Sequence, residues 1–278
     1  MSITISDLGF EYKNGNNKVK ALSNISITIE YGSFTAIVGE TGSGKSTLLR
    51  ILAGFENGYS GKINLGELKK SDIRMVFQYP EYQLFEDYVL KDVMFGPKNM
   101  GLSPEEAEDK AIWALDTVGL EEKYWDRSPF KLSGGQKRLV AIAGILAMKP
   151  KVVLLDESTA GLDPFHARKI MEIFKQLNSE GTTVIIVTHS MEDVLEYADF
   201  VVALNRGRVM TDGKEGTVNT FEYFTKCVDD EKNVPNSIKL LSSLHEKGYN
   251  VHVDRFKYEE SIEEVIRMVR EYGGANWR

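Results

Sequence analysis

Apolar residues alternate with polar ones near the N-terminus and then form an unbroken run. The alternation covers residues 3–5 and 25–29, which predicts two antiparallel strands with turn residues at 14–17 between them. The unbroken run 35–38 predicts a buried strand that leads into a glycine-rich loop, and 46–53 has the pattern of a helix. This part therefore combines an antiparallel β subdomain with the start of an α/β core.

Helical patterns dominate the middle of the chain, from about residue 82 to 148. Ser103 is a suitable N-cap for a helix, and Pro104 is a suitable first residue. The apolar face of this helix is formed by Ala111, Trp113, Ala114, Leu115 and Val118. A second helical run covers 137–148, so we expect a helical subdomain here.

Strands return after this helical stretch. Residues 151–155 and 183–187 are mostly apolar, which is typical of central strands in a parallel sheet covered on both faces. A helix is expected between them over 167–177, and 200–204 together with 208–210 predict a late hairpin. This order predicts an α/β fold with a mainly parallel sheet.

The last stretch, 219–278, carries no identifiable chemistry and is predicted to be a small α/β addition to a main domain over 1–218. We expect a helix at 236–247, a strand at 250–253 and a helix at 261–271. Apolar residues at helical spacing in the two helices are Ile238, Leu241 and Leu244, and Ile262, Val265, Ile266 and Val269. Two interpretations stay open: the stripes pack on the main domain, or they hold two chains together.

The composition is that of a globular protein without a membrane segment. Apolar residues make up 42% and charged residues 27% of the 278 residues, and the net charge of -7 is opposite in sign to that of most nucleic-acid binders. The longest apolar run, 139–148, has about half of the roughly 20 residues that a membrane helix needs. The N-terminus lacks a secretory pattern and the single Cys227 cannot form an internal disulfide, so we expect a reducing, cytoplasmic location and no nucleic-acid partner.

The glycine-rich loop matches the phosphate-loop pattern G-x-x-x-x-G-K-[ST], with a strand before it and a helix after it. Its residues are Gly39, Glu40, Thr41, Gly42, Ser43, Gly44, Lys45, Ser46 and Thr47. Glycines let successive backbone N–H groups point at one anion, and the helix N-terminus adds a partial positive charge. Lys45 is expected to reach the β- and γ-phosphates of ATP, and the Ser46 hydroxyl to bind Mg²⁺.

Two acids end the apolar strand that follows the helical subdomain. Asp156 is expected at the tip of a buried strand, where a carboxylate can hold Mg²⁺. Glu157 comes next and is placed to act as a general base toward the attacking water. With a phosphate loop upstream, these acids predict hydrolysis of the nucleotide.

A third motif distinguishes this chain from many other phosphate-loop proteins. Leu132 is followed by Ser133, Gly134, Gly135 and Gln136 at the start of a helical run. A Ser-Gly-Gly sequence at a helix N-terminus offers a hydroxyl and free N–H groups to phosphate oxygens. The motif lies about twenty residues before the two acids, and this order is specific.

In this order the motifs resemble those of the ABC ATPases over roughly residues 1–215. The resemblance implies a RecA-like phosphate-loop NTPase core with a mainly parallel sheet, an N-terminal antiparallel β subdomain and a helical signature subdomain. It also implies ATP and Mg²⁺ as cofactors. The implied activity is ATP hydrolysis.

The resemblance assigns further roles at single positions. Tyr12 matches the aromatic residue that stacks on adenine, and Gln78 the glutamine that touches Mg²⁺ and the attacking water. Leu162 and Asp163 match the loop that crosses the dimer interface, and His189 the histidine that contacts the γ-phosphate. A binding module that never hydrolyses ATP would not need both a general base and this histidine.

Members of the family pack as head-to-tail dimers, in which the signature loop of each chain completes the nucleotide site of the other. The resemblance therefore implies that Ser133, Gly134, Gly135 and Gln136 contact nucleotide bound by a partner chain, identical or paralogous. One departure is Ser158, which stands where the family often has proline.

The segment 76–85 resembles the energy-coupling factor group, because Gln78 is followed by proline, an acidic residue and then Gln-Leu-Phe. The residues Lys137-Arg138 and Val140-Ala141-Ile142-Ala143 after the signature also resemble this group. The group implies import of a vitamin or a transition-metal ion with a transmembrane coupling subunit and a substrate-binding membrane subunit. The chain would then lie at the cytoplasmic face of the membrane. Tyr82, Leu84 and Phe85 are predicted to form the apolar contact with the coupling subunit; the alternative is that Leu84 and Phe85 pack the helical subdomain.

Other members of the family remain as alternatives: the ATPase of another importer or exporter, or an ABC ATPase without a transport role. A DNA-repair type would separate the phosphate loop and signature by a long coiled coil, whereas here they lie about ninety residues apart without heptads. A translation-factor type would carry two cassettes, and this chain has one. The transported solute belongs to another chain and stays open.

Overall fold

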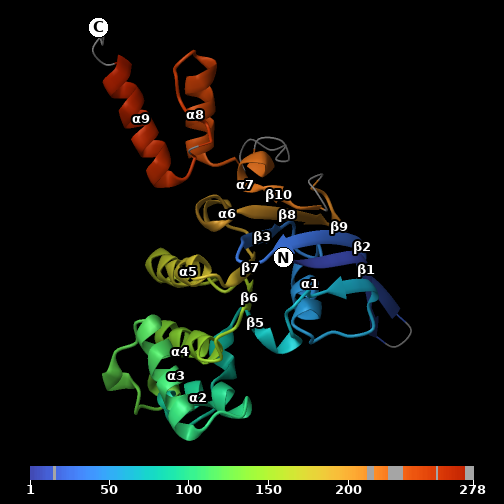
Figure 1. The fold of residues 1–278 in the computed structure, drawn as a ribbon, viewed down its shortest axis with the longest axis vertical. Coiled ribbons are helices and arrows are strands. Elements are labelled where there is room, and N and C mark those ends of the chain that lie inside the picture. Colours follow the sequence, from blue (N-terminus) through green and yellow to red (C-terminus); the bar gives the residue numbers. More distant parts are fainter. Residues whose placement is uncertain (15–16, 212–215, 225–233, 255, 273–278) are drawn as a thin grey trace.

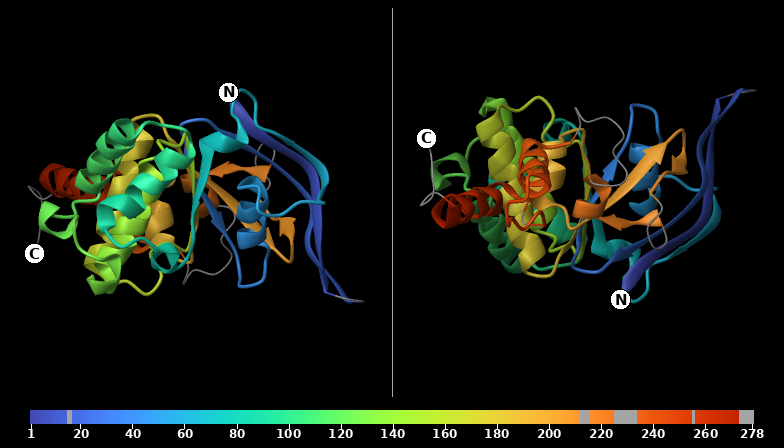
Figure 2. Two further views of the ribbon diagram at one scale, coloured as in Figure 1. Left: turned by 90° about the horizontal axis from the view of Figure 1, so that it is seen from below. Right: turned by 90° about the horizontal axis from the view of Figure 1, so that it is seen from above.

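The computed structural model describes residues 1–14, 17–211, 216–224, 234–254 and 256–272. They form a central sheet with an antiparallel sheet on one side, helices on the other and a helical subdomain at one end (Figures 1 and 2). The predicted turn at 14–17 lies partly outside the described residues, and Cys227 lies entirely outside them.

The central sheet has the strand order β10-β8-β3-β7-β6-β5, with β9 paired to β8. Its parallel strands are β3 (Phe34–Val38), β5 (Ile73–Val76), β6 (Val152–Asp156), β7 (Thr183–Val187) and β8 (Phe200–Asn205). Every residue of β3 and β7 is buried, which confirms that these apolar runs are central strands. The carboxyl ends of β3, β5, β6 and β7 therefore meet at one edge of the sheet.

The antiparallel sheet consists of β1 (Ser2–Asn14), β2 (Asn17–Glu30) and β4 (Ser60–Asn64) in the order β2-β1-β4. Ile3 and Ile5 on β1 pair with Ile29 and Ile27 on β2, and all four side chains are buried. The predicted alternation is confirmed. This sheet and helix α1 (Lys45–Leu52) enclose one apolar cluster between them and the central sheet.

The other face of the central sheet is covered by α5 (Pro164–Ser179) and α6 (Met191–Tyr197). The helical subdomain contains α2 (Val89–Asn99), α3 (Pro104–Thr117) and α4 (Gly134–Leu146). Short 3₁₀ turns lie at Lys70–Asp72, Pro80–Gln83, Glu122–Tyr124 and Pro129–Lys131. Ser103 caps α3 as predicted, because its hydroxyl accepts the N–H of Glu106 at 3.2 Å.

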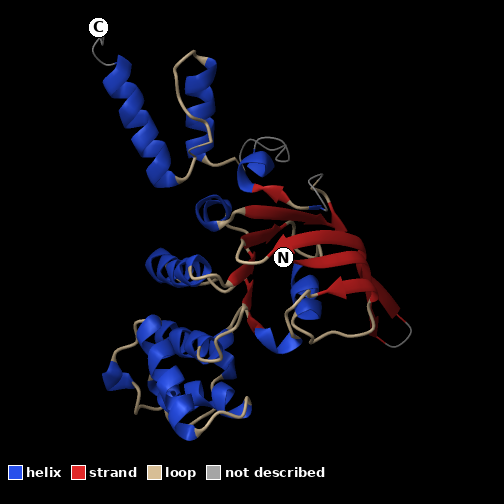
Figure 3. Ribbon diagram, in the orientation of Figure 1, coloured by secondary structure: helices blue, strands red, loops and turns tan. Residues whose placement is uncertain are grey.

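After the hairpin strand β9 (Arg208–Val209), the chain adds β10 (Val218–Asn219), α7 (Thr220–Glu222), α8 (Asn236–Glu246) and α9 (Tyr258–Tyr272). Helices α8 and α9 project beyond the sheet (Figures 1 and 3). Among the described residues, none of the helices is long and apolar enough to cross a membrane.

The strand expected at 250–253 is wrong. Its backbone groups bond to side chains of α9 instead of a neighbouring strand: the His252 N–H donates to Glu264 Oε1 at 2.7 Å, and the Asn250 carbonyl accepts from Arg267. Val251 is buried, which explains the apolar pattern, but no strand lies beside it in the described part of the chain. After β10, this addition is therefore helical where it is described.

Candidate active site

The phosphate loop joins β3 to α1 with a backbone that only glycine can adopt at two positions. Gly39 has φ 144°, and a Cβ there would lie 2.0 Å from the Leu204 carbonyl oxygen. Gly44 has φ 101°, and its Cβ would lie 2.6 Å from a methyl group of Leu22. The loop is thus held against β2 and β8 by close backbone packing, with the N-terminus of α1 directly after it.

The side chain of Lys45 folds back over this loop. Its Nζ donates to the carbonyl oxygens of Gly39 at 2.8 Å and Glu40 at 2.9 Å. Burial lowers the pKa of Lys45, and the nearby carboxylates of Glu157 and Asp156 oppose this effect. The ammonium group lies at the centre of the loop, where phosphate oxygens could replace the two carbonyls as its partners.

Another buried group in the loop fits a nucleotide. The Ser43 hydroxyl is buried without a hydrogen-bond partner among the described residues. Such a group costs about 1–3 kcal/mol unless something bonds to it. A phosphate oxygen within the loop would accept this bond.

Ser46 and Asp156 meet at the same sheet edge. The Ser46 hydroxyl donates to Asp156 Oδ1 at 2.8 Å. Burial raises the pKa of Asp156, and the hydrogen bond from Ser46 lowers it. The described residues contain no cluster of three His, Cys, Asp or Glu side chains that would hold a metal by themselves. One hydroxyl and one carboxylate suit Mg²⁺, which takes its other ligands from phosphates and water.

Glu157 lies between the ends of three adjacent strands. It accepts a hydrogen bond from Gln78 Nε2, after β5, at 3.2 Å, and lies 3.1 Å from His189 Nε2, after β7. Its own N–H donates to the Val187 carbonyl at 3.0 Å, and its φ of 49° is in the left-handed region. This conformation costs on the order of 1 kcal/mol for a residue with a side chain. In this conformation the carboxylate faces Gln78 and His189.

Tyr12 stands beside the phosphate loop. Its hydroxyl is 3.3 Å from Thr47 Oγ1, and its ring packs edge-on against Phe10 with a centroid distance of 4.9 Å. The residue is exposed, at 37% of its surface. The structure therefore brings Tyr12, the phosphate loop, Gln78 and the two acids toward one region of the molecule.

The signature residues 133–136 lie away from the phosphate loop of the same chain. The Ser133 hydroxyl accepts the Gln136 N–H, and the Gln136 side chain accepts the Ser133 N–H, which forms a capping box at the start of α4. Asp163 caps α5 and lies 2.6 Å from His166 Nδ1. Helix α4 belongs to the helical subdomain, apart from α1 (Figure 1). The exposed Ser133 and Gly134 face solvent instead of the chain's own phosphate loop.

The prediction for Leu84 is wrong. Its side chain is 7% exposed and belongs to the apolar core of the helical subdomain, so it cannot anchor a partner. Phe85 is 54% exposed and Tyr82 is 83% exposed. Aromatic neighbours that the sequence pattern did not single out extend this exposed group. We call it the aromatic surface; it consists of the ring pairs Tyr79–Tyr82 and Phe85–Phe95.

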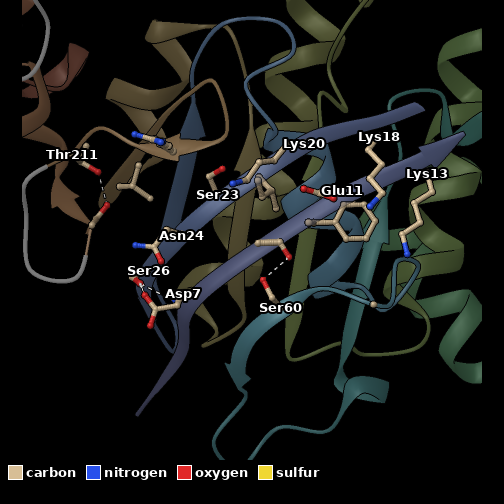
Figure 4. Close-up of a pocket in the computed structure, with 17 residues that line it drawn as sticks. Asp7, Glu11, Lys13, Lys18, Lys20, Ser23, Asn24, Ser26, Ser60 and Thr211 are labelled. Atoms are coloured by element: carbon tan, nitrogen blue, oxygen red, sulfur yellow. Dashed lines mark hydrogen bonds between the residues drawn. The ribbon is translucent and has the colours of Figure 1, made fainter. Parts of the chain in front are cut away.

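A cavity of about 1040 Å³ lies elsewhere, along β1 and β2 (Figure 4). Glu11, Lys13, Lys18 and Lys20 line it, and no residue of the phosphate loop does. Glu11 and Lys13 alternate with Tyr12 along the strand and so point to the opposite face. Tyr12 does not line the cavity either, although its ring neighbour Phe10 does.

Comparisons with known proteins show the family of this chain. The family model described as ABC transporter matches residues 22–160. The chain is 43% identical over 281 aligned residues to the energy-coupling factor transporter ATP-binding protein EcfA2 of Streptococcus pyogenes, covering 96% of this chain and 99% of that protein.

Solved structures show the same fold. CbiO1 of Clostridium perfringens, part of the ABC transporter complex cbiONQ, superposes with a TM-score of 0.70 at 35% identity, covering 88% of this chain and 96% of that one. A dimeric ATP-binding cassette in a post-hydrolysis state with ADP and Pi gives a TM-score of 0.68 at 30% identity, covering 78% of this chain and 98% of that one.

Proposed function

Because this chain belongs to the family of ABC transporter ATPases, we propose that it powers an importer of the energy-coupling factor type by binding and hydrolysing ATP. The observation that carries the proposal is the convergence of Glu157, Gln78 and His189 next to the Ser46–Asp156 pair. The 43% identity to a protein named for energy-coupling factor transport supports the choice of importer type. The alternative is another class of ABC transporter ATPase.

The proposed chemistry divides the site residues into two groups. Tyr12, the loop 39–47 and Lys45 bind ATP, with the loop N–H groups and the ammonium on its phosphates. Ser46, Asp156 and Gln78 would hold Mg²⁺, which would neutralise charge on the phosphate oxygens.

Glu157 acts as the general base toward water, since its carboxylate stands at the sheet edge beside these groups. Gln78 and His189 orient this carboxylate through their hydrogen bonds to it. With nucleotide bound, Gln78 would contact the water and His189 the γ-phosphate.

The signature loop would serve a second ATPase chain. Ser133 and Gly134 are exposed and Gly135 and Gln136 are half-buried at the N-terminus of α4, where the capping box between Ser133 and Gln136 is already formed. A head-to-tail dimer would place this anion-binding end, together with Asp163, over nucleotide on the partner. The partner is an identical chain or a paralogue.

The aromatic surface is the proposed contact with the transmembrane coupling subunit, which would keep the chain at the cytoplasmic face of the membrane. Phe85 packs edge-on against Phe95 at 4.7 Å, and Tyr79 lies 5.8 Å from Tyr82. A short apolar helix of the coupling subunit could seat its side chains here. A separate membrane subunit would bind the solute, a vitamin or a transition-metal ion.

Replacing Tyr82 and Phe85 together with serine is expected to release the membrane partner and leave ATP binding intact. Both side chains are exposed, so folding should persist, and losing two anchors costs on the order of 2–4 kcal/mol, or roughly 30-fold or more in affinity. The measurement is copurification of membrane chains from the native membrane, with ATP binding followed in the same preparation.

Met100→Ser is the matched control, because Met100 is an exposed apolar residue of the same subdomain outside the aromatic surface. It should retain the membrane chains. If the double variant copurifies with the same chains as the wild type, the proposed docking surface is wrong.

The proposed domain division is 1–218 for the ATPase and 219–278 for the addition. Strand β10 crosses this boundary and pairs with β8, and Tyr223 and Phe224 are buried. A truncation that respects this packing therefore ends after Phe224. One helical stripe of the addition is largely internal, since Ile238 and Leu241 are buried, whereas another on α9 is exposed.

The exposed stripe on α9 is proposed to hold two ATPase chains together between ATP cycles. It consists of Ile262, Ile266 and Val269, each more than 40% exposed. Changing Ile262 and Ile266 to glutamate should yield a folded monomer that dimerises only with ATP, because two charges would have to be buried in the contact. Sedimentation without nucleotide measures the assembly.

Glu259→Lys, an exposed change on the same helix, is the control and should leave the assembly unchanged. If the double variant still forms a dimer without nucleotide, the exposed stripe on α9 has no role in assembly.

A further inference from the structure

One arginine outside the nucleotide site is almost completely enclosed. Arg138 lies in the second turn of α4, five residues after Ser133, and is 3% exposed. A buried guanidinium is stable only when its charge is paired and its donors are bonded, because leaving it without partners is strongly unfavourable. The partners of Arg138 therefore show what this residue holds in place.

The guanidinium binds two segments that are far apart in the sequence. In the segment after β5, Nε and Nη2 each donate at 3.1 Å to the two carboxylate oxygens of Glu81, and Nη2 donates to the Gln78 carbonyl at 3.2 Å. In the segment after β6, Nη1 donates to the carbonyls of Ser158 at 3.4 Å and Ala160 at 3.0 Å. All three guanidinium nitrogens are engaged, with five hydrogen bonds matching the five donors of an arginine.

Both segments carry groups of the proposed mechanism. Gln78 bonds to Glu157 through its side chain and to Arg138 through its carbonyl. Ser158 directly follows Glu157 and lacks the ring that a proline would supply to fix the backbone. Arg138 holds the Ser158 carbonyl in place and so restrains the left-handed turn at Glu157.

The same guanidinium also reaches the aromatic surface. Glu81 lies between Tyr79 and Tyr82, and the Tyr79 ring centroid is 6.0 Å from the guanidinium carbon. A displacement of this surface would pull on Glu81 and therefore on Arg138. Because Arg138 sits on the signature helix, the displacement would reach the loop after Glu157 and α4 together.

We infer that Arg138 is a positioning residue that couples the aromatic surface to the alignment of Glu157. The inference rests on the proposed function, in which Glu157 is the general base. Arg138 touches none of the reacting groups itself. Lysine keeps the charge but offers three donors without the planar fork, so it cannot bind Glu81 with two parallel bonds and both loop carbonyls at once.

Arg138→Lys in the complete chain, purified with its membrane chains, should lower kcat for MgATP on the order of 10- to 100-fold. Displacing a catalytic group by about 1 Å costs on the order of 100-fold. KM for ATP and ATP binding should change less than about 3-fold, because the phosphate loop is untouched. Arg127→Met, an exposed arginine of the same subdomain, is the control and should hydrolyse ATP like the wild type.

Glu81→Gln tests the same coupling with a smaller change. It keeps the inference testable if the Arg138→Lys variant does not fold. It should also lower kcat, and the double variant with Arg138→Lys should be no slower than the slower single variant, since both remove one connection. A wild-type kcat in folded Glu81→Gln or Arg138→Lys would overturn the inference, as would a loss of ATP binding in parallel with kcat. If Glu157→Gln hydrolyses ATP normally, the proposed function fails instead, whatever Arg138 does.

Discussion

Replacing Glu157 with glutamine is expected to lower ATP turnover by about 100-fold or more while ATP binding persists, the usual scale for loss of a general base. Glutamine has nearly the same size, so it can keep contact with Gln78 and His189, but it cannot take a proton from water. The variant should accumulate as an ATP-bound dimer. Single-turnover hydrolysis and sedimentation with ATP measure the two effects.

Glu172→Gln is the matched control, because Glu172 is an exposed glutamate that pairs with Arg168 on α5. Its turnover should equal that of the wild type, since exposed ion pairs contribute little. Near-normal hydrolysis by Glu157→Gln would remove Glu157 from the proposed role.

Replacing Gly135 with aspartate is expected to block hydrolysis and leave ATP binding by the isolated monomer nearly unchanged. A Cβ at Gly135 meets its nearest neighbour, a ring carbon of His166, at 3.7 Å, which is ordinary contact, so the fold should tolerate the change. In the proposed dimer the new carboxylate would face the phosphates on the partner chain and repel them. ATP binding to the monomer and steady-state hydrolysis are the two measurements.

Gly144→Asp on the same helix is the control, because an added Cβ there has no neighbour within 4 Å and the position is remote from the signature loop. It should hydrolyse ATP normally. If Gly135→Asp abolished ATP binding by the monomer, the signature loop would serve its own chain's site and the proposed dimer arrangement would be wrong.

The placement of the candidate site residues on strands, loops and helix starts was largely predictable because it depends on short contiguous motifs. The phosphate loop between strand 35–38 and helix 46–53 is confirmed as a loop between β3 and α1. The run 151–155 is confirmed as β6, displaced by one residue, which places Asp156 at its end. Motifs of this kind specify their own backbone, since glycines at φ 144° and 101° and a buried apolar strand leave few alternatives.

Features that depend on partners far away in the chain were not predictable. Leu84 and Phe85 are adjacent apolar residues, and only the packing of the helical subdomain buries the first and exposes the second. Strand β4 was missed because four of its five residues are exposed and carry little apolar alternation. The strand at 250–253 was predicted wrongly because Val251 is buried. A buried apolar residue gives the same local sequence pattern whether a neighbouring strand or a helix covers it.

The sequence by itself determined which residues are proposed to bind phosphate, metal and water, because these residues belong to motifs with short spacings within one strand, loop or helix start. Only the tertiary structure decided which of them meet, since Gln78, Glu157 and His189 come from three strands whose order in the sheet no local pattern encodes. It also decided the contacts of Arg138, whose five hydrogen bonds join segments about 20 and about 60 residues away in the sequence. Such contacts depend on how the helical subdomain packs against the sheet. Once this packing buries the guanidinium, the fold needs all of these hydrogen bonds, because a buried charge without partners is strongly destabilising.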